Sequence, residues 1–547
     1  MDSLKPMLLT SLKSYDKSQF FKDVTAGIIV AIIALPLSIA LALASGVGPE
    51  AGIFTAIVAG FVISALGGSS VQIAGPTAAF ATIVAGIVAK NGMDGLIIST
   101  ILAGIFLLIM GLCHFGSLIK FIPYTITTGF TSGIAVTIVI GQLKDFFGIT
   151  YQNGETPIET IEKLEAVFKN FSTLNINALI IGIISLAILI ISPYIFKKIP
   201  GSLIAVIAGI VMVKFLPLKA NTIGDLYTIS NSLPAFHLPK VNLEIIEQSA
   251  SDAFTIAILA AIESLLSCVV ADGMINGKHR SDMELVAQGA GNIASALFGG
   301  IPATGAIART AANIKNGGRT PIAGMVHSIT LVIVLVVLMP YAGLIPMPTI
   351  AAILFMVAYN MCQWRTFVDL VKTAPKSDII VLLTTFFLTV LFDLVVAIEI
   401  GMVLACLLFI KRMSEETHVD SWTYVDDDTP DINENLKKLP LQIRVYEITG
   451  PLFFGAADAI EHIVVKDFTK CLVIRMRSVP AIDASAMKSL HELADRAKKK
   501  NITLIFSHVN EQPMKVMAKD GFVDLIGKEN FHANIVDALD YAETLVK

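Results

Sequence analysis

The sequence contains little charge and none of the common catalytic motifs. Asp, Glu, Lys and Arg account for 15% of its 547 residues, whereas a soluble domain carries about 25%. A phosphate-binding loop, a nucleophile elbow and an HExxH zinc motif are all missing from the sequence. We therefore expect neither an enzyme nor a protein with a nucleic-acid partner.

Cysteine is scarce as well, and the five residues are isolated from one another. Cys113, Cys268, Cys362, Cys406 and Cys471 form no CxxC pair and no Cys/His cluster. Neither a metal site nor a disulfide framework is therefore supported, and no organic cofactor is expected. Cysteines placed singly in apolar segments are better explained as small packing residues.

Long apolar runs, by contrast, are abundant. Hydrophobic residues make up 54% of the chain, and its mean hydropathy is +0.74. A helix that crosses a bilayer needs about 20 apolar residues. We predict fourteen spans, some of them short, at 24–44, 52–66, 76–89, 95–113, 125–141, 179–193, 202–215, 254–271, 285–298, 305–314, 325–338, 348–359, 379–391 and 395–410.

Charged residues concentrate in the last quarter of the chain, which indicates a different kind of domain. We predict a membrane domain at 1–412, a connector at 413–436 and a cytosolic α/β domain at 437–547. Within the last part, alternating patterns predict a small sheet with helices packed on it. The expected elements are a strand pair and a helix in 441–464, strands at 470–479 and 501–509, and helices at 483–500, 512–522 and 534–546.

The distribution of positive charge predicts the orientation in the membrane. An even number of spans places both termini on one side, and Lys and Arg gather there, as in 5–22, 278–280 and 315–319. Cytoplasmic loops carry this excess, so both termini are expected in the cytoplasm of a multi-pass protein of the plasma membrane. No signal peptide is evident, because the first apolar run is too long for one.

Two of the predicted spans are interrupted by Gly, Pro and Thr. They are SSVQIAGPTAAFATIV (69–84) and FGGIPATGAIARTAANI (298–314), about half the membrane domain apart. Such a pair in matching positions is the best sequence indication of a transporter built from inverted repeats, although two ordinary kinks are the alternative. Seven spans in each half would fit this arrangement.

A helix that begins inside the membrane leaves backbone N–H groups without partners at its first turn. These groups and the helix dipole favour negative charge. We expect the helices to begin at Pro76–Thr77 and Thr304–Gly305, with Thr as a cap. Small residues at both starts would let an anion reach the backbone. The proposed anion site comprises Thr77, Ala78, Ala79, Phe80, Gly305, Ala306, Ile307 and Arg309, with Leu37 and Leu41 after Pro36 as an apolar wall.

Two charged residues within these spans are hypothesised to have functional roles. Arg309 follows the second interruption, and a lone arginine at the bilayer centre costs about 2.5–3.5 kcal/mol even on a lenient scale. It either adds positive charge to the anion site or pairs structurally with Glu263. Glu263 and Ser267 lie four residues apart, hence on one helix face, and suit a proton relay or a Na⁺ site.

These motifs resemble a known family. PLSIALALASGVGPEAGIFTA, GSSVQIAGPTAAF and ATGAIARTAANIKNGGRTPIAG resemble signature blocks of the SulP anion transporters, the sulfate permease family, and GFTSGIAVTI, AIESLLSCVVADG and KHRSDMELVAQGAGN add to the match. The tail is similar to a STAS domain. Among bacterial members the chain looks most like the C4-dicarboxylate (succinate/fumarate) type.

The resemblance implies fourteen spans as a 7+7 inverted repeat, divided into a core (spans 1–4 and 8–11) and a gate (spans 5–7 and 12–14). It implies an anion site between spans 3 and 10, elevator-type movement of the core, and a homodimer. Glu263 and Ser267 match a cation-coupling acid and hydroxyl, and Arg309 matches the arginine of span 10. Leu37 and Leu41 depart from animal members, which carry Gln and often an aromatic residue there, so a simple inorganic-ion preference is in doubt.

The segment VPAIDASAMKSL of the STAS-like part resembles a loop of related bacterial antagonist proteins, in which a phosphorylatable serine directly follows an Asp. Here Asp483 is followed by Ala484, and the serine is Ser485. A phospho-switch is therefore doubtful, and we expect both residues to cap the next helix.

Taken together, the sequence predicts a secondary transporter of a small anion such as sulfate, bicarbonate or a C4-dicarboxylate, coupled to H⁺ or Na⁺. One alternative is a membrane-anchored interaction module that binds a cytosolic protein through its STAS domain. Another is an uncoupled anion channel.

Overall fold

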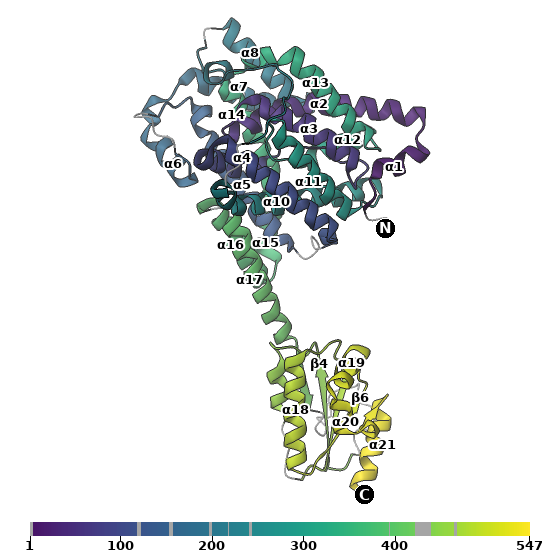
Figure 1. Cartoon of the computed structure of the whole chain (residues 1–547). Coiled ribbons are helices and arrows are strands. Elements are labelled where there is room, and N and C mark those ends of the chain that lie inside the picture. The colour runs from purple at the N-terminus through teal and green to yellow at the C-terminus, as the bar shows by residue number, and fades with distance from the viewer. Residues whose placement is uncertain are drawn as a thin grey trace. The chain divides into compact units, whose positions relative to one another are not determined.

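Apolar helices form the first of two units into which the chain divides, Met1–Met402, and an α/β fold forms the second, Val403–Lys547 (Figure 1). The computed structural model describes residues 4–117, 122–151, 157–195, 200–216, 218–239, 243–392, 394–421, 439–463 and 468–547. The division falls inside the helix Leu394–Glu415, and 422–436 of the predicted connector lies outside the described residues. The predicted boundaries at 412 and 436 stay predictions.

The membrane part is almost entirely helical. In chain order its helices are α1 (Met7–Ser11), α2 (Lys17–Ala44), α3 (Pro49–Leu66), α4 (Ala81–Leu112), α5 (Tyr124–Phe147), α6 (Thr160–Lys169), α7 (Ile176–Ile195), α8 (Gly201–Phe215), α9 (Ile223–Leu226), α10 (Leu243–Ile275), α11 (Ser281–Leu297), α12 (Ile307–Lys315), α13 (Ile322–Ala342), α14 (Met347–Cys362), α15 (Trp364–Thr373), α16 (Lys376–Leu391) and α17 (Leu394–Glu415).

Local sequence explains where several of these helices begin and turn. Asp16 caps α2 by accepting a hydrogen bond from the backbone N–H of Gln19 at 2.7 Å. Pro49 occupies the first position of α3, where its missing N–H costs nothing. Gly92 has a φ of +66°, which glycine adopts freely, and joins two helices within α4. Pro36 lies inside α2, which continues through it to Ala44.

Each predicted span coincides with one of these helices or with one half of α4. Among the described residues, eight helices are long and apolar enough to cross a membrane. α8, α12 and α16 are shorter, as their sequences suggest. The chain is thus a polytopic helical protein, while the count of fourteen crossings stays a prediction.

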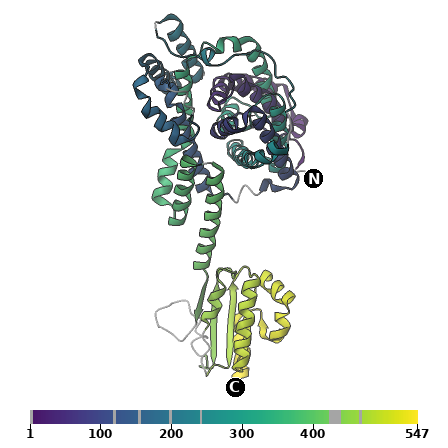
Figure 2. The same ribbon diagram turned by 60° about the vertical axis from the view of Figure 1, so that its left-hand side comes forward.

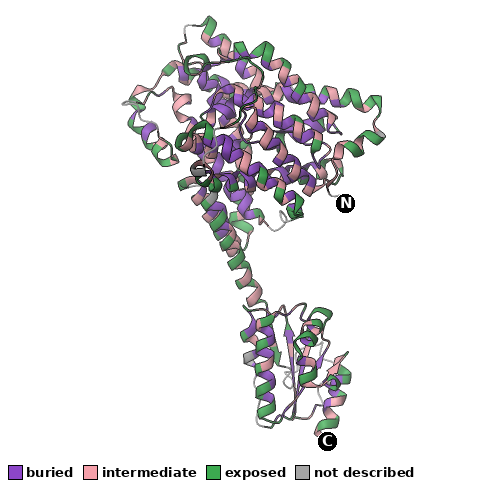
Figure 3. Ribbon diagram, viewed as in Figure 1, coloured by how far each residue is buried: buried purple, intermediate pink, exposed green. Residues whose placement is uncertain are grey.

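Two groups of helices pack mainly among themselves within the first unit. The core group comprises α2, α3, α4, α10, α11, α12 and α13, and the gate group comprises α5, α7, α8, α14 and α16. Figure 2 shows them as a purple and teal group beside a blue and green one. Buried residues fill the interior of this unit (Figure 3). Large apolar side chains such as Ile183 and Phe215 are exposed. Such a surface suits lipid rather than water.

The second unit is a five-stranded sheet with helices on both faces. Its elements are β3 (His418–Ser421), β4 (Ile443–Thr449), β5 (Cys471–Ser478), α18 (Ala484–Lys499), β6 (Thr503–Ser507), α19 (Glu511–Asp520), α20 (Phe522–Ile526), β7 (Phe531–His532) and α21 (Ile535–Val546). The strand order is β3-β4-β5-β6-β7, with β3 antiparallel to β4 and the others parallel. Alternate side chains separate two apolar layers, one around α18 and one under α21.

The order of the main strands and helices agrees with the sequence prediction, with some differences. The helix predicted in 441–464 is a 3-10 helix, η8 (Ala457–His462), and the short helix α20 was not predicted. The predicted strand pair in 441–464 is a single strand, β4, whose antiparallel partner β3 comes from the predicted connector. The very short β7 was not predicted, because two residues give no alternating pattern.

Candidate functional site

The two interrupted segments meet inside the core group. β1 (Ala74–Gly75) pairs antiparallel with β2 (Thr304–Gly305), so that Ala74 lies opposite Gly305 and Gly75 opposite Thr304. β1 leads through a 3-10 turn, η3 (Ala78–Phe80), into α4, and β2 leads into α12. The sequence prediction that the two segments lie together is confirmed.

The predicted helix starts need correction. The helical turns begin at Ala78 and Ile307, one to three residues later than expected, and the side chains of Thr77 and Thr304 do not cap them. Thr77 Oγ1 instead donates to Glu263 Oε2 at 2.9 Å, and Thr304 Oγ1 donates to the carbonyl of Ala260 at 3.2 Å. The hydroxyls turn away from the helices because α10 runs alongside and offers acceptors.

α10 supplies most of the polar contacts at the crossing. Ser264 Oγ lies 2.6 Å from Thr304 Oγ1 and accepts the N–H of Gly305 at 3.0 Å. Ser267 Oγ donates to Thr310 Oγ1 of α12 at 3.4 Å. Glu263 and Ser267 both face the crossing of β1 and β2, as their spacing on one helix face predicts. Glu263 contacts the segment before α4, whereas Ser267 contacts α12.

Arg309 lies at the crossing and is 3% exposed. One guanidinium nitrogen donates to the carbonyl of Pro76, which joins α12 to the end of β1. The other, Nη1, has no hydrogen-bond partner among the described residues, and a Cβ added to Gly75 would lie 2.3 Å from it. The described residues contain no ion pair between Arg309 and Glu263, so the alternative that Glu263 neutralises Arg309 is not supported.

The predicted substrate residues differ in their accessibility. Ala78, Ala79, Phe80, Gly305, Ala306 and Leu41 are buried. Thr77, Leu37 and Glu263 are partly exposed, and Ile307 is 44% exposed. α2, which carries the two leucines, packs against both α4 and α12. The structure thus collects the predicted residues around one crossing, with the ends of the helices covered in this conformation.

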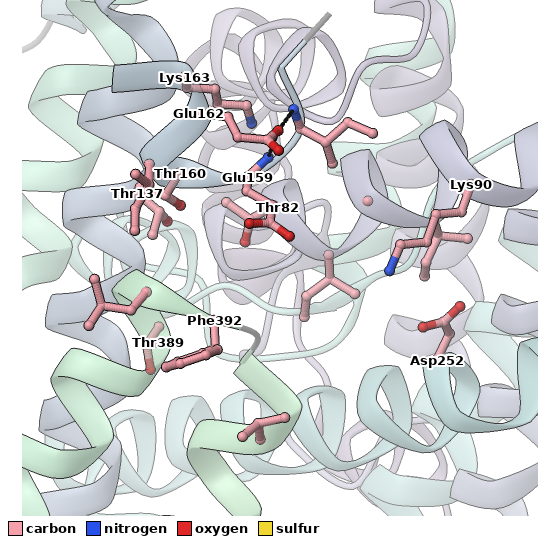
Figure 4. A pocket seen from close by; sticks show the side chains of 17 residues that line it. Thr82, Lys90, Thr137, Glu159, Thr160, Glu162, Lys163, Asp252, Thr389 and Phe392 are labelled. Carbon is pink, nitrogen blue, oxygen red and sulfur yellow. Dashed lines mark hydrogen bonds between the residues drawn. The ribbon is translucent and has the colours of Figure 1, made fainter. Parts of the chain in front are cut away.

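A cleft of about 800 Å³ runs along α4 beyond the crossing. Its α4 side is formed by Thr82, Ile83, Gly86, Ile87 and Lys90, and the facing side by α5, α6, α16 and the start of α17. Figure 4 shows Lys90 and Asp252 on one side of the cleft and Thr137, Thr389 and Phe392 on the other. The cleft therefore lies between the core and gate groups, and its lining begins at Thr82, two residues after Phe80.

A short helix, α6, lines part of this cleft. Glu162 of α6 accepts hydrogen bonds from the backbone N–H groups of Ile158 and Glu159, at 3.1 and 3.2 Å (Figure 4). These bonds form a capping box that holds the first turn of α6 over the cleft. Burial lowers the pKa of Lys163 on the same helix.

Two buried carboxylates that sequence analysis missed hold the extended segments in place. Glu284 of α11 accepts the N–H groups of Gly68 and Ser69 and the side-chain amides of Gln72 and Gln288. It is completely buried. A single acid near the start of an amphipathic span carries no signal of this role, since its partners are far away in the sequence.

Asp23 of α2 does the same for the segment that follows α12. It accepts the backbone N–H of Arg319 and the hydroxyl of Thr320, and also the side chains of Tyr15 and Gln19. Burial, and next the charge of Asp23, raise the pKa of Tyr15 to about 12. Both half-helix segments are therefore anchored by carboxylates of the core group.

In the second unit, Asp483 caps α18 as predicted. Its Oδ1 accepts the N–H of Ala486 and its Oδ2 accepts the N–H of Phe454, both at 2.9 Å. Ser485 lies within the first turn and does not cap, because Asp483 already fills that position. A regulatory role of either residue stays a prediction.

No part of the described chain groups three or more His, Cys, Asp or Glu side chains as a metal site would. The oxygen atoms at the crossing come instead from Glu263, Thr77, Ser264 and Thr304. This donor set suits a proton or a hard monovalent cation better than a transition metal.

A bundle of apolar helices in two groups, with two interrupted helices meeting in the core, is the architecture of a membrane transporter. The sequence matches the model described as "Sulfate permease family" over residues 20–385 and the STAS domain over residues 437–538. The chain therefore belongs to the sulfate permease family.

Relatives and solved structures agree with this assignment. The "Putative sulfate transporter YvdB" of Bacillus subtilis is 39% identical over 95% of this chain and 97% of its own length. The "Bicarbonate transporter BicA" of Picosynechococcus is 32% identical over 87% of this chain and 86% of its own. Because its relatives are transporters, the chain is a transporter and not an enzyme.

Two solved structures share the fold. The murine Slc26a9 anion transporter in the inward-facing state aligns with a TM-score of 0.89 over 99% of this chain and 94% of that one, at 18% identity. The transmembrane domain of a cyanobacterial BicA aligns with a TM-score of 0.62 over 72% of this chain and 98% of that one, at 28% identity. A multi-pass membrane domain followed by a STAS domain is thus the architecture of this chain.

Proposed function

We propose that the chain is a secondary active transporter of a small anion in the bacterial plasma membrane, with both termini in the cytoplasm. The observation that carries this proposal is the crossing of β1 and β2, with Arg309 buried beside it. α4 and α12 both begin there, and their first turns add positive dipole ends to the guanidinium charge. A site built this way binds an anion in the middle of the membrane domain.

We propose sulfate or bicarbonate as the transported ion, the ions named for the relatives. A C4-dicarboxylate is the second candidate, because Leu37 and Leu41 add an apolar wall that would suit its carbon chain. The dipoles contribute about 0.3–2 kcal/mol each, so binding is modest and the anion can leave, as transport requires.

Glu263 is the proposed carrier of the coupling cation, H⁺ or Na⁺. Its carboxylate accepts from Thr77, the residue directly before η3, so a proton or cation on Glu263 acts on the start of the anion site. A divalent anion entering a negative-inside cell works against roughly 2.3 kcal/mol per charge per 100 mV, which coupled cations offset.

The two helix groups are the proposed moving parts. In an elevator-type step the core group would carry the crossing past the gate group, and the cleft along α4 would open or close. We further propose that the transporter is a homodimer in the lipid bilayer and that its STAS domain binds a cytosolic protein.

Binding is tested first with the purified full chain. A ligand that binds only the folded state raises its apparent stability, by about 2.7 kcal/mol at one hundred times its Kd. Sulfate, bicarbonate, fumarate and succinate are compared with chloride at equal ionic strength. We expect one of these anions to raise the midpoint of thermal unfolding of the unmodified chain. The same anion should not raise the midpoint of the Arg309→Ala variant. If no anion acts, or if Arg309→Ala responds equally, the proposed site is wrong.

Coupling is tested by uptake of the identified anion into proteoliposomes with an imposed proton or Na⁺ gradient. We expect Glu263→Gln to abolish gradient-driven accumulation, because a neutral amide carries no cation. Glu399→Gln, an exposed acid on α17, is the matched control and should behave like the unmodified chain. Accumulation that survives in Glu263→Gln would refute its role, and anion conductance without any gradient dependence would indicate a channel.

A further inference from the structure

A row of four polar residues crosses the sheet of the second unit on the face that α21 covers. The parallel registers place Glu447 beside Arg475, Arg475 beside Ser507, and Ser507 beside His532. Residues opposite each other in neighbouring strands point to the same face. We call these four residues the polar row.

The polar row lies one layer beyond an apolar layer, toward the carboxyl ends of the strands. Val445, Val473 and Ile505, each two residues earlier in its strand, pack under Leu539 and the alanines of α21. The sheet face therefore changes from apolar to polar at one level across three neighbouring strands. The carboxyl ends of parallel strands are where open α/β sheets bind ligands.

Several polar atoms at this level are buried without a partner. Among the described residues, Ser507 Oγ, His508 Nδ1 and His532 Nε2 are inaccessible and make no hydrogen bond, and Ser507 is 0% exposed. His508 follows the row directly and donates its backbone N–H to the carbonyl of His532 at 3.1 Å. Leaving such a buried atom unsatisfied costs about 1–3 kcal/mol.

The charge around these atoms is positive. Arg475 Nη1 lies 3.2 Å from Glu447 Oε2, which balances one guanidinium group. Arg477, two residues further along β5, adds a second at the exposed end of the strand. Burial, together with the charges of Arg475 and Arg477, lowers the pKa of His508, so its ring is neutral at pH 7 and has one N–H to donate.

We propose that the polar row, with Arg477 and His508, is a binding site for a small oxyanion of the phosphate or sulfate type in the STAS domain. The Ser507 hydroxyl, the two imidazoles and a guanidinium are all groups that donate to oxyanion oxygens. One tetrahedral ion would satisfy atoms that otherwise stay unpaired. This site is separate from the transport site, since none of its residues belongs to the membrane part.

The test measures hydrogen–deuterium exchange of the full chain in detergent, with inorganic phosphate, inorganic sulfate or chloride at equal ionic strength. Using the Arg309→Ala background removes the proposed transport site from the result. We expect phosphate or sulfate, at one hundred times its Kd, to slow exchange in 503–509 and 530–541 by about one hundredfold. Chloride should have no effect there, because it offers no array of oxygen acceptors.

Ser507→Ala is expected to abolish this protection while the domain stays folded, since it removes an unsatisfied hydroxyl. Ser489→Ala is the matched control, because Ser489 lies on α18 against the opposite face of the sheet. His532→Gln provides a second variant in case Ser507→Ala alters folding. Protection that persists in both variants, or that chloride reproduces, would refute the site. The site would also be refuted if exchange in these segments slowed only when anionic phospholipid is added, or if neither phosphate nor sulfate slowed it.

Discussion

At the scale of single residues, two buried carboxylates matter as much to the site as the residues expected to touch the anion. Glu284 accepts four hydrogen bonds from the chain that leads into β1 and from its own helix. Asp23 gathers the chain that leaves α12. An extended segment inside a membrane protein needs such partners, because lipid offers none for its backbone N–H groups.

Glu284→Gln is therefore expected to destabilise the membrane part. An amide keeps one acceptor oxygen but directs an NH₂ group toward buried N–H donors, and a hydrogen bond to a charged group contributes about 1.5–3 kcal/mol. We expect a loss of about 2–4 kcal/mol, measured as a lower midpoint of thermal unfolding in detergent. Glu247→Gln, at an exposed acid of α10, is the control. Equal midpoints for the two variants would contradict this role of Glu284.

At the scale of elements, small residues allow the core helices to approach closely. α4 and α11 cross where Gly104 and Gly289 face each other, and a Cβ on Gly289 would lie 2.6 Å from the carbonyl oxygen of Gly104. The obstacle is backbone, which cannot move aside as a flexible side chain does. This contact fixes the helix that carries Glu284 against the helix that begins at the crossing.

Gly289→Ala should consequently separate α4 from α11. We expect a loss of about 1–3 kcal/mol, the usual cost of overpacking, and faster hydrogen exchange in both helices. Gly273→Ala on α10 is the matched change, because nothing lies within 4 Å of a Cβ added there. It should be neutral or slightly stabilising, since alanine favours helix over glycine by about 1 kcal/mol. If Gly289→Ala is as stable as Gly273→Ala, the close crossing is not a feature of the folded protein.

At the scale of the whole molecule, the chain contains two units with separate cores. Phe506 is fully buried in the apolar layer around α18, within the second unit. Phe506→Ala should destabilise this unit by about 3–5 kcal/mol and leave the first unit unchanged. Urea unfolding followed by hydrogen exchange should show the two units responding at different midpoints, with only the second one shifted. A single shift common to both units would show that they unfold together.

Much of the architecture was determined by the sequence alone. Apolar runs predicted the helices because a membrane-spanning segment needs length and hydrophobicity, which are local properties. The Gly, Pro and Thr interruptions predicted two broken helices for the same reason. The motif blocks predicted the family, which the comparisons confirm.

The partners of the polar groups were decided only by the tertiary structure. Thr77 and Thr304 were expected to cap helices, yet they bond to α10, and Glu263 was considered as a partner of Arg309, yet it binds Thr77. Glu284, Asp23 and the polar row depend on residues brought together from distant parts of the chain. A hydrogen bond is a short-range contact, so local sequence can show that a polar side chain needs a partner but not which one it meets.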